Sequence, residues 1–340
     1  MTEEKENIET VQQKFEIIAW IFTSVSLLCS VVVIFITYSK KLYKNITNQF
    51  IIQISISEII NNLTQLGSII TLLIGEKELK YAERMRVCYA QIYLNLFSNF
   101  FTLCSSVIIS FRIYDLLVKN SNIFKKPSNV LIAKVSSVFL CIVISYIFWI
   151  TQMVSGQDYN TTSNKYVKIL SCWGANSFDY GILPIYAILI GLIGYFCFKA
   201  YCFIRNYKQK MMEDNENLTE EKGNKEQLQK AKAVQIRLIL DPICTAILYA
   251  LISAHRIIVL ATPKMKIDNI SEQLNLTFIL YIIPTILRGL IFGIIYFGTQ
   301  KTFRQELFNY LTCKTCKKKE MKDLPNTEGM SLASISEEEE

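Results

Sequence analysis

The sequence has little charge and almost no histidine. Only 19% of its 340 residues are charged, 51% are hydrophobic, and His255 is the single histidine. So low a share of charge is not typical of a soluble domain and favours a membrane protein. One imidazole also excludes the clustered-histidine zinc site of a membrane hydrolase. We therefore predict no metal site, no cofactor and no enzyme activity.

The hydrophobic residues gather in seven long runs. A helix needs about 20 apolar residues to cross a hydrocarbon core about 30 Å thick. The runs cover 15–38, 48–74, 88–118, 130–153, 178–204, 234–260 and 274–298. They predict an all-α bundle of seven transmembrane helices over residues 15–298. The acidic segment 1–14 lacks the basic start and small-residue cleavage site of a signal peptide, so we expect a short extracellular N-terminus.

Lysine and arginine are unevenly distributed between the loops, which predicts the orientation. With the N-terminus outside, the inner segments hold 19 basic residues and the outer ones hold 10. The positive-inside rule then places the C-terminus in the cytoplasm of a plasma-membrane protein. The sequons at Asn160 and Asn269 fall on the outer side, where they could be glycosylated. Because the basic residues flank the runs, the net charge of +7 indicates attraction to membrane lipid and no nucleic-acid partner.

Four cysteines lie at or beyond the ends of the apolar runs, and by position they fall into two pairs. Cys88 and Cys172 lie on the oxidising outer face, and we predict a disulfide that ties the loop 154–177 over the mouth of the bundle. Cys313 and Cys316 lie inside, next to three lysines. A single C-x-x-C supplies half a zinc site, so palmitoylation is the better interpretation.

The segment that follows the seventh run is amphipathic. Residues 299–316 predict an interfacial helix that lies along the membrane, with its apolar side chains on one face. Residues 317–340 are polar and acidic, and we expect a disordered cytoplasmic tail. Serines there precede four glutamates, which suggests phosphorylation and a kinase- or arrestin-like partner; plain solvated disorder is the alternative.

Polar side chains occur at helical spacing inside the apolar runs. The second run carries a stripe at i, i+3, i+4 and i+7: Glu58, Asn61, Asn62 and Gln65. An unpaired guanidinium is costly in hydrocarbon, so we expect Arg288 of the seventh run to pair with Glu58. The three amides would then accept from the remaining N–H donors. In the third run, Gln91 and Asn95 belong to another stripe, which either joins helices or lines a ligand cavity.

Three motifs resemble the cyclic-AMP-receptor-like (class E) family of G-protein-coupled receptors and its secretin and adhesion relatives. The motifs are Cys172-Trp173, then Asp241-Pro242 followed by His255-Arg256, and Arg288-Gly289 followed by Tyr296. The family has Asn where His255 stands and Gln where Arg288 stands. Fourteen residues before the first run leave no room for a hormone-binding ectodomain. The resemblance therefore implies a small ligand bound within the bundle.

These observations predict a receptor that signals through a heterotrimeric G protein. Ligand binding would shift the population toward a state in which the sixth helix swings about Pro242. We predict five residues that contact the ligand: Gln91, Asn95, Trp173, His255 and Arg256. The last two are cationic, which favours an anionic ligand. For coupling we predict Arg112, Asp115, Lys208 and Lys232, with Tyr296 beside the polar network.

The sequence also bears on two other functions of membrane proteins. A retinal protein needs a Schiff-base lysine in the seventh run, and residues 274–298 contain none. An ion or small-solute transporter is the alternative that remains, because charged residues inside the membrane often mark an ion path. Neither an internal repeat nor a pair of broken helices is present to favour it.

Overall fold

The structure is a computed structural model, and it describes residues 2–75, 81–119, 121, 123–154, 179–215, 222–261, 279–280, 283–299, 304–305 and 308. Within these residues the secondary structure is entirely helical, which confirms the predicted all-α class. The long helices are α1 (Thr2–Ser39), α2 (Ile46–Gly75), α3 (Tyr81–Leu117), α4 (Pro127–Val154), α5 (Asp179–Asn215), α6 (Lys222–Ala261) and α8 (Ile283–Thr299). The label α8 thus denotes the seventh predicted span.

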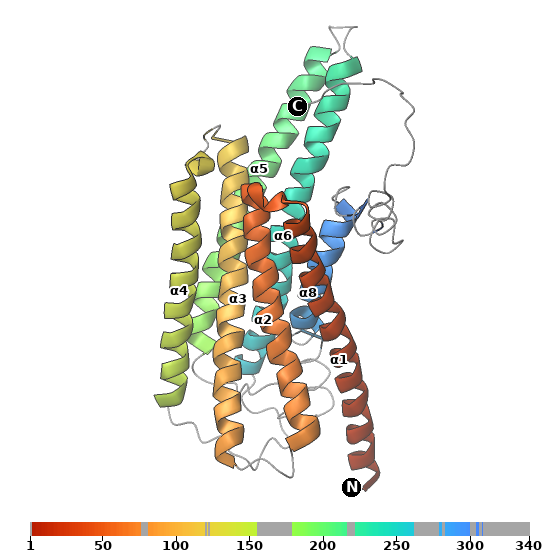
Figure 1. Ribbon diagram of the computed structural model, residues 1–340, viewed down its shortest axis with the longest axis vertical. Helices are drawn as coiled ribbons and strands as arrows, with labels where there is room; N and C mark the ends of the chain where they lie inside the picture. Colours follow the sequence, from red (N-terminus) through yellow and green to blue (C-terminus); the bar gives the residue numbers. More distant parts are fainter. Residues whose placement is uncertain are drawn as a thin grey trace, which may run out of the picture.

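The helices form an elongated bundle around α3 (Figure 1). α3 packs against α2, α4, α5 and α6, while α1 packs against α2 and α8. The helices α5 and α6 extend together beyond the others at the end opposite the N-terminus. α1 begins at Thr2, so residues 2–14 of the predicted short extracellular N-terminus are helical.

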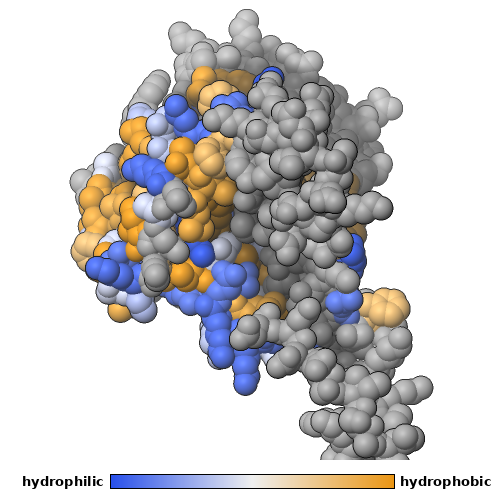
Figure 2. All heavy atoms as spheres, turned by 90° about the horizontal axis from the view of Figure 1, so that it is seen from above, coloured by the Kyte–Doolittle hydropathy of each residue, from blue (hydrophilic) through white to orange (hydrophobic). Residues whose placement is uncertain are grey.

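Five of these helices are long and apolar enough to cross a membrane. The spans are Ile17–Ser39, Ala90–Leu117, Pro127–Thr151, Gly181–Asn206 and Ile239–Ile258. A shorter apolar stretch, Leu287–Gly298, lies in α8. Exposed apolar side chains cover the flanks of these helices. The view down the bundle in Figure 2 shows hydrophilic side chains next to these apolar side chains. The chain is a multi-pass membrane protein.

Polar side chains tie the short connections at the end of the bundle opposite the N-terminus. The turn between α1 and α2 includes the 3₁₀ helix η1 (Leu42–Lys44), preceded by Lys41 at a φ of 53°. Asn45 Oδ1 then accepts from the Thr47 N–H at 2.9 Å, as at the start of many helices. After α3, Asp115 accepts from the Ile123 N–H at 3.0 Å and from the Ser121 hydroxyl. This buried carboxylate fixes the start of the 3₁₀ helix η2 (Ile123–Lys125).

Two glycines allow α8 to approach α1 closely. A Cβ on Gly289 would collide with Ser26 Oγ and lie 3.2 Å from the Ser26 carbonyl oxygen. A Cβ on Gly293 would lie 2.8 Å from Cβ of Cys29. Small residues at a helix interface let two backbones pack closely in a membrane, where lipid offers no hydrophobic driving force. These glycines therefore set the position of α8 and of the side chains that it carries.

Candidate functional site

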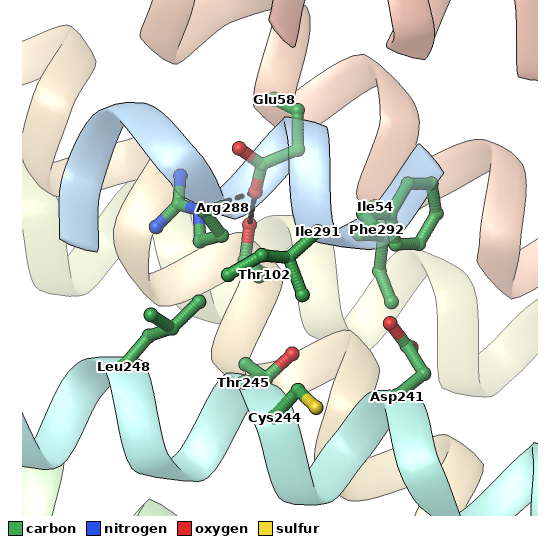
Figure 3. Close-up of a pocket in the computed structure, with 10 residues that line it drawn as sticks. All are labelled: Ile54, Glu58, Thr102, Asp241, Cys244, Thr245, Leu248, Arg288, Ile291 and Phe292. Carbon is green, nitrogen blue, oxygen red and sulfur yellow. Dashed lines mark hydrogen bonds and ion pairs between the residues drawn. The ribbon is translucent and has the colours of Figure 1, made fainter. Parts of the chain in front are cut away.

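The centre of the bundle contains an ion pair between α2 and α8. Arg288 Nε contacts Oε1 of Glu58, and the two residues are only 3% and 0% exposed. Figure 3 shows the two side chains meeting between the helices. A single charge is expensive inside a membrane, and breaking a buried pair leaves such a charge uncompensated. Each residue therefore makes the burial of the other tolerable.

Arg288 also joins α3 and α6 to this pair. Its Nη1 donates to Asn99 Oδ1 at 2.8 Å and to the Tyr249 hydroxyl. The Tyr249 hydroxyl donates in turn to Asn99, with 3.1 Å to both Oδ1 and the backbone oxygen. The guanidinium carbon lies 5.2 Å from the centroid of the Tyr249 ring, which is within the range of a cation–π contact. One side chain on α8 thus contacts three other helices.

Hydroxyl groups of α2 and α3 support the carboxylate of Glu58. Thr102 Oγ1 donates to Oε1 of Glu58 at 3.2 Å and lies 2.8 Å from Ser57 Oγ. Ser57 Oγ donates to the backbone oxygen of Ser98. These side chains are all buried. The carboxylate is therefore held by hydrogen bonds from α3 as well as by the cation from α8.

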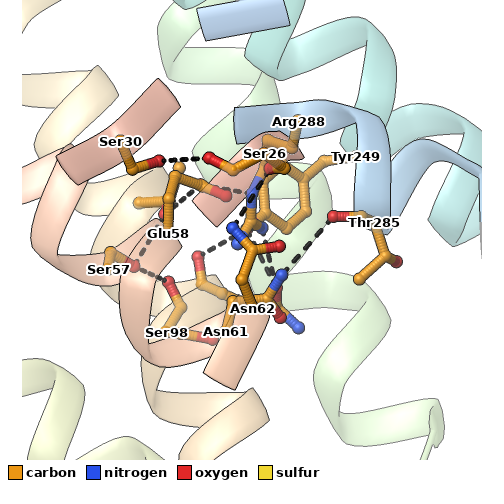
Figure 4. Close-up of polar contacts among 12 residues, drawn as sticks. Ser26, Ser30, Ser57, Glu58, Asn61, Asn62, Ser98, Tyr249, Thr285 and Arg288 are labelled. Atoms are coloured by element: carbon orange, nitrogen blue, oxygen red, sulfur yellow. Dashed lines mark hydrogen bonds and ion pairs between the residues drawn. The ribbon is translucent and has the colours of Figure 1, made fainter. Parts of the chain in front are cut away.

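The amides of the α2 stripe are buried but differ from the expected arrangement. Asn61 Nδ2 donates to the Thr285 backbone oxygen at 3.4 Å, and Asn62 Nδ2 donates to Ser26 Oγ at 3.1 Å (Figure 4). Asn61 Oδ1 and Asn62 Oδ1, which were predicted to accept from Arg288, have no hydrogen-bond partner among the described residues. Both asparagines lie about one turn along α2 from Glu58. Asn61 therefore lies beside Thr285 of α8, and Asn62 reaches α1. Gln65 is also buried, at 9% exposure.

The predicted ligand-binding residues lie one to two turns beyond this centre. Gln91 and Asn95 are buried on α3, and Asn95 Oδ1 accepts from Asn99 Nδ2 at 2.6 Å. Arg256 is buried and His255 is half-buried, two turns along α6 from Tyr249. Four of the five predicted residues therefore lie on α3 and α6, towards the end of the bundle where α1 begins. Trp173 lies outside the described residues.

The other predicted residues fall into two groups. Arg112 donates to the Thr47 hydroxyl across α3 and α2, and Tyr296 is buried with its ring 4.5 Å from that of Phe292. The described exposed residues after α8 include Arg304 and Phe308. The remaining predicted residues lie where the structure does not describe side chains: Cys88, Lys208, Lys232, Asn160, Asn269, Cys172, Cys313, Cys316 and the tail 317–340.

Sequence reasoning missed the contribution of α6 to the centre. Tyr249 lies in an apolar run, but it is seven residues from both Pro242 and Arg256. Seven residues are close to two helical turns, so this spacing could have placed Tyr249 on the inward face. Thr102 offered no such signal, because a helical hydroxyl often bonds to its own backbone.

A small cavity adjoins the ion pair on the side of α6. Glu58, Thr102 and Arg288 line it from three helices, and Asp241 and Cys244 line it from α6 (Figure 3). Among the described residues, no three His, Cys, Asp or Glu side chains are placed to hold a metal ion. The cavity thus brings two carboxyl groups and one guanidinium together.

The fold is similar to that of known receptors. The chain superposes on the crystal structure of squid rhodopsin with a TM-score of 0.66 and 14% sequence identity, covering 94% of this chain and 93% of that one. No protein-family model and no curated protein sequence matches the chain. At this identity the likeness concerns the fold alone. The chain has the seven-helix fold of a G-protein-coupled receptor.

Proposed function

We propose that this protein is a receptor that signals through a heterotrimeric G protein by movement of α6. The fold supports this proposal, since squid rhodopsin matches nearly the whole chain. The transmembrane spans and the basic residues of the inner loops favour a plasma-membrane location with the N-terminus outside.

The single observation that carries the proposal is the contact of Tyr249 with Arg288 and Asn99. Through it, α6 is held to α3 and α8 near the middle of the bundle. Pro242 lies seven residues away within the same helix, where it removes a backbone hydrogen bond and favours bending. In our proposal, the swing of α6 about Pro242 also strains the Tyr249 contact. The contact therefore favours the resting state, and a ligand that weakens it favours the active one.

The ligand we propose is small and anionic, and it binds between α3 and α6. Gln91 and Asn95 offer amides, while Arg256 offers positive charge and His255 offers a ring N–H donor. Asn95 is bonded to Asn99, so a ligand that contacts Asn95 reaches Tyr249 through one intervening side chain. We further propose that the protein is related to the cyclic-AMP-receptor-like receptors, a proposal that the sequence motifs of α6 and α8 support.

Replacing Tyr249 by phenylalanine tests this function. The change keeps the ring and removes the hydroxyl, so it should weaken the hold on α6 by about 1 kcal/mol, a typical value for a hydrogen bond between membrane helices. Such a change shifts a two-state equilibrium about fivefold. We expect basal G-protein activation to rise by about that factor in cells that report dissociation of the G protein.

The matched control is Tyr146→Phe, because Tyr146 is half exposed on α4, away from this contact. It should leave basal activation unchanged. Equal activation by Tyr249→Phe, Tyr146→Phe and the wild type at the same surface expression would contradict the proposed role of Tyr249.

A transporter remains the second function to test, because two carboxyl groups and one guanidinium meet at one cavity inside the membrane. A screen of small anionic molecules, read by G-protein dissociation and by ion flux in parallel, separates the two. Dissociation without flux supports the receptor, whereas flux without dissociation favours the transporter.

A further inference from the structure

One oxygen of the Asp241 carboxyl group has no hydrogen-bond partner in the part of the chain that the structure describes. Asp241 lies on α6 next to Pro242, is 4% exposed and points from α6 towards α8 (Figure 3). Its Oδ2 has no hydrogen-bond partner among the described residues. A buried polar atom without a partner is rare and needs a physical explanation. Its position deep in the bundle makes that need stronger, because lipid surrounds the helices.

The charges around Asp241 do not balance if every group is ionised. The titratable groups that face it are Glu58 from α2, Cys197 from α5, Cys244 from α6, and Arg288 and Tyr296 from α8. From α3, the cavity receives the hydroxyl of Thr102. Arg288 is the one cation among these groups, and it is paired with Glu58. Two carboxylates would therefore share one guanidinium.

One bound proton removes this imbalance. With Glu58 ionised against Arg288, a neutral Asp241 leaves the cavity without net charge. Two nearby carboxyl groups in a water-poor site commonly hold a proton between them, because both cannot ionise without strong repulsion. Thr102 and Arg288 donate to or contact Glu58, so the proton belongs on Asp241 in this arrangement.

We propose that this cavity is a proton-binding site, with the proton carried by Asp241 while α6 packs against α8. If α6 moves the carboxyl group towards water, its O–H bond breaks, the electron pair stays on the carboxylate and the proton passes to water. The two positions of α6 then differ by one proton. This inference goes beyond the proposed receptor function and does not depend on a ligand or a G protein.

Infrared spectroscopy of the purified full chain in lipid nanodiscs tests the site directly. A neutral carboxylic acid has a C=O stretch that carboxylates lack and that shifts in D₂O. We expect this band at neutral pH in the wild type and its loss in Asp241→Asn, which keeps the shape of the side chain. Asp115→Asn is the matched control, because Asp115 lies outside this cavity, at the end of α3, where its side-chain oxygens accept from the Ser121 hydroxyl and the Ile123 N–H. A wild type without the band, or Asp241→Asn with the full band, overturns the proposal.

Thermal unfolding at different pH values gives a second measurement. The native state would hold a proton that the unfolded chain, whose aspartates titrate near about pH 3.9, has lost at neutral pH. Between about pH 5 and the pH at which the native state releases this proton, stability should therefore fall as the pH rises, with the unfolding equilibrium constant increasing about tenfold per pH unit for one proton. Asp241→Asn should lack this dependence.

Asp241→Thr is a second neutral variant, for use if Asp241→Asn does not accumulate as folded protein. A pH dependence of the same size in the wild type and in a neutral variant would contradict the proton site. The difference between the wild type and a neutral variant is what decides, because every other titratable group contributes to the pH dependence of both proteins.

Discussion

The helices α3 and α4 are neighbours with opposite surroundings. In the apolar span of α3, 72% of the residues in an 18-residue stretch are buried, whereas the corresponding share in the span of α4 is 22%. The buried polar residues of α3 include Asn95, Asn99 and Thr102, whereas α4 presents large apolar side chains such as Leu131 and Phe139 outward. Inside a membrane, polarity thus marks the surface that faces protein, and apolarity marks the surface that faces lipid.

The comparison also shows where the bundle can tolerate change. On α4, an exposed apolar side chain can be replaced by another with little loss, because lipid adapts to its shape. On the polar side, each group has few partners and no water to replace them. We therefore expect substitutions near α3 to cost much more than substitutions on the outer face of α4.

The largest expected effect comes from removing one half of the ion pair. Glu58→Gln leaves Arg288 buried and uncompensated, which should cost about 3–5 kcal/mol. Replacing both residues, as Glu58→Gln with Arg288→Gln, removes the charge altogether and should recover much of that loss. The measurements are the yield of monodisperse protein and the unfolding temperature, with Phe139→Leu on α4 as the control. A double variant as unstable as the single one would contradict a direct pairing.

A medium effect should follow from filling the contact between α8 and α1. Gly289→Ala places a methyl group against Ser26 and should cost about 1–3 kcal/mol, as overpacking commonly does. Gly191→Ala on α5 is the matched control, because nothing lies within 4 Å of a Cβ there. Unfolding temperatures in one detergent compare the two variants. An equal response would mean that the close approach of α8 to α1 has no role in stability.

The smallest effect tests whether the polar stripe also stabilises contacts away from the charge. Asn62→Ala removes the hydrogen bond to Ser26 and should cost about 1 kcal/mol. Ser26→Ala removes the same bond from the other side. A double-mutant cycle of unfolding temperatures should give a non-additive result. Strict additivity would show that this hydrogen bond contributes nothing to stability.

The sequence predicted the helical type and the approximate limits of the five membrane-length spans among the described residues, because hydrocarbon imposes their length and composition. It also predicted that Arg288 would need Glu58, since a charge in a membrane narrows the choice of partner to a few residues. It did not predict that Asn99 and Tyr249 would share the guanidinium. That arrangement depends on how four helices are shifted and rotated relative to one another. The periodicity of a single helix carries no information about these shifts and rotations. Asp241 was recognised as an intramembrane charge, but its place in the cavity also required the packed bundle.

The contact between α1 and α8 has a consequence for how the protein is made. The first and last long helices lie side by side, so the ring of helices closes only when synthesis reaches α8. Glu58 therefore enters the membrane long before Arg288 exists. During that interval its carboxyl group depends on a proton, on water or on donors such as Thr102. The acidic residue is thus synthesised first and its counter-ion last, so the ion pair can form only at the end of membrane insertion.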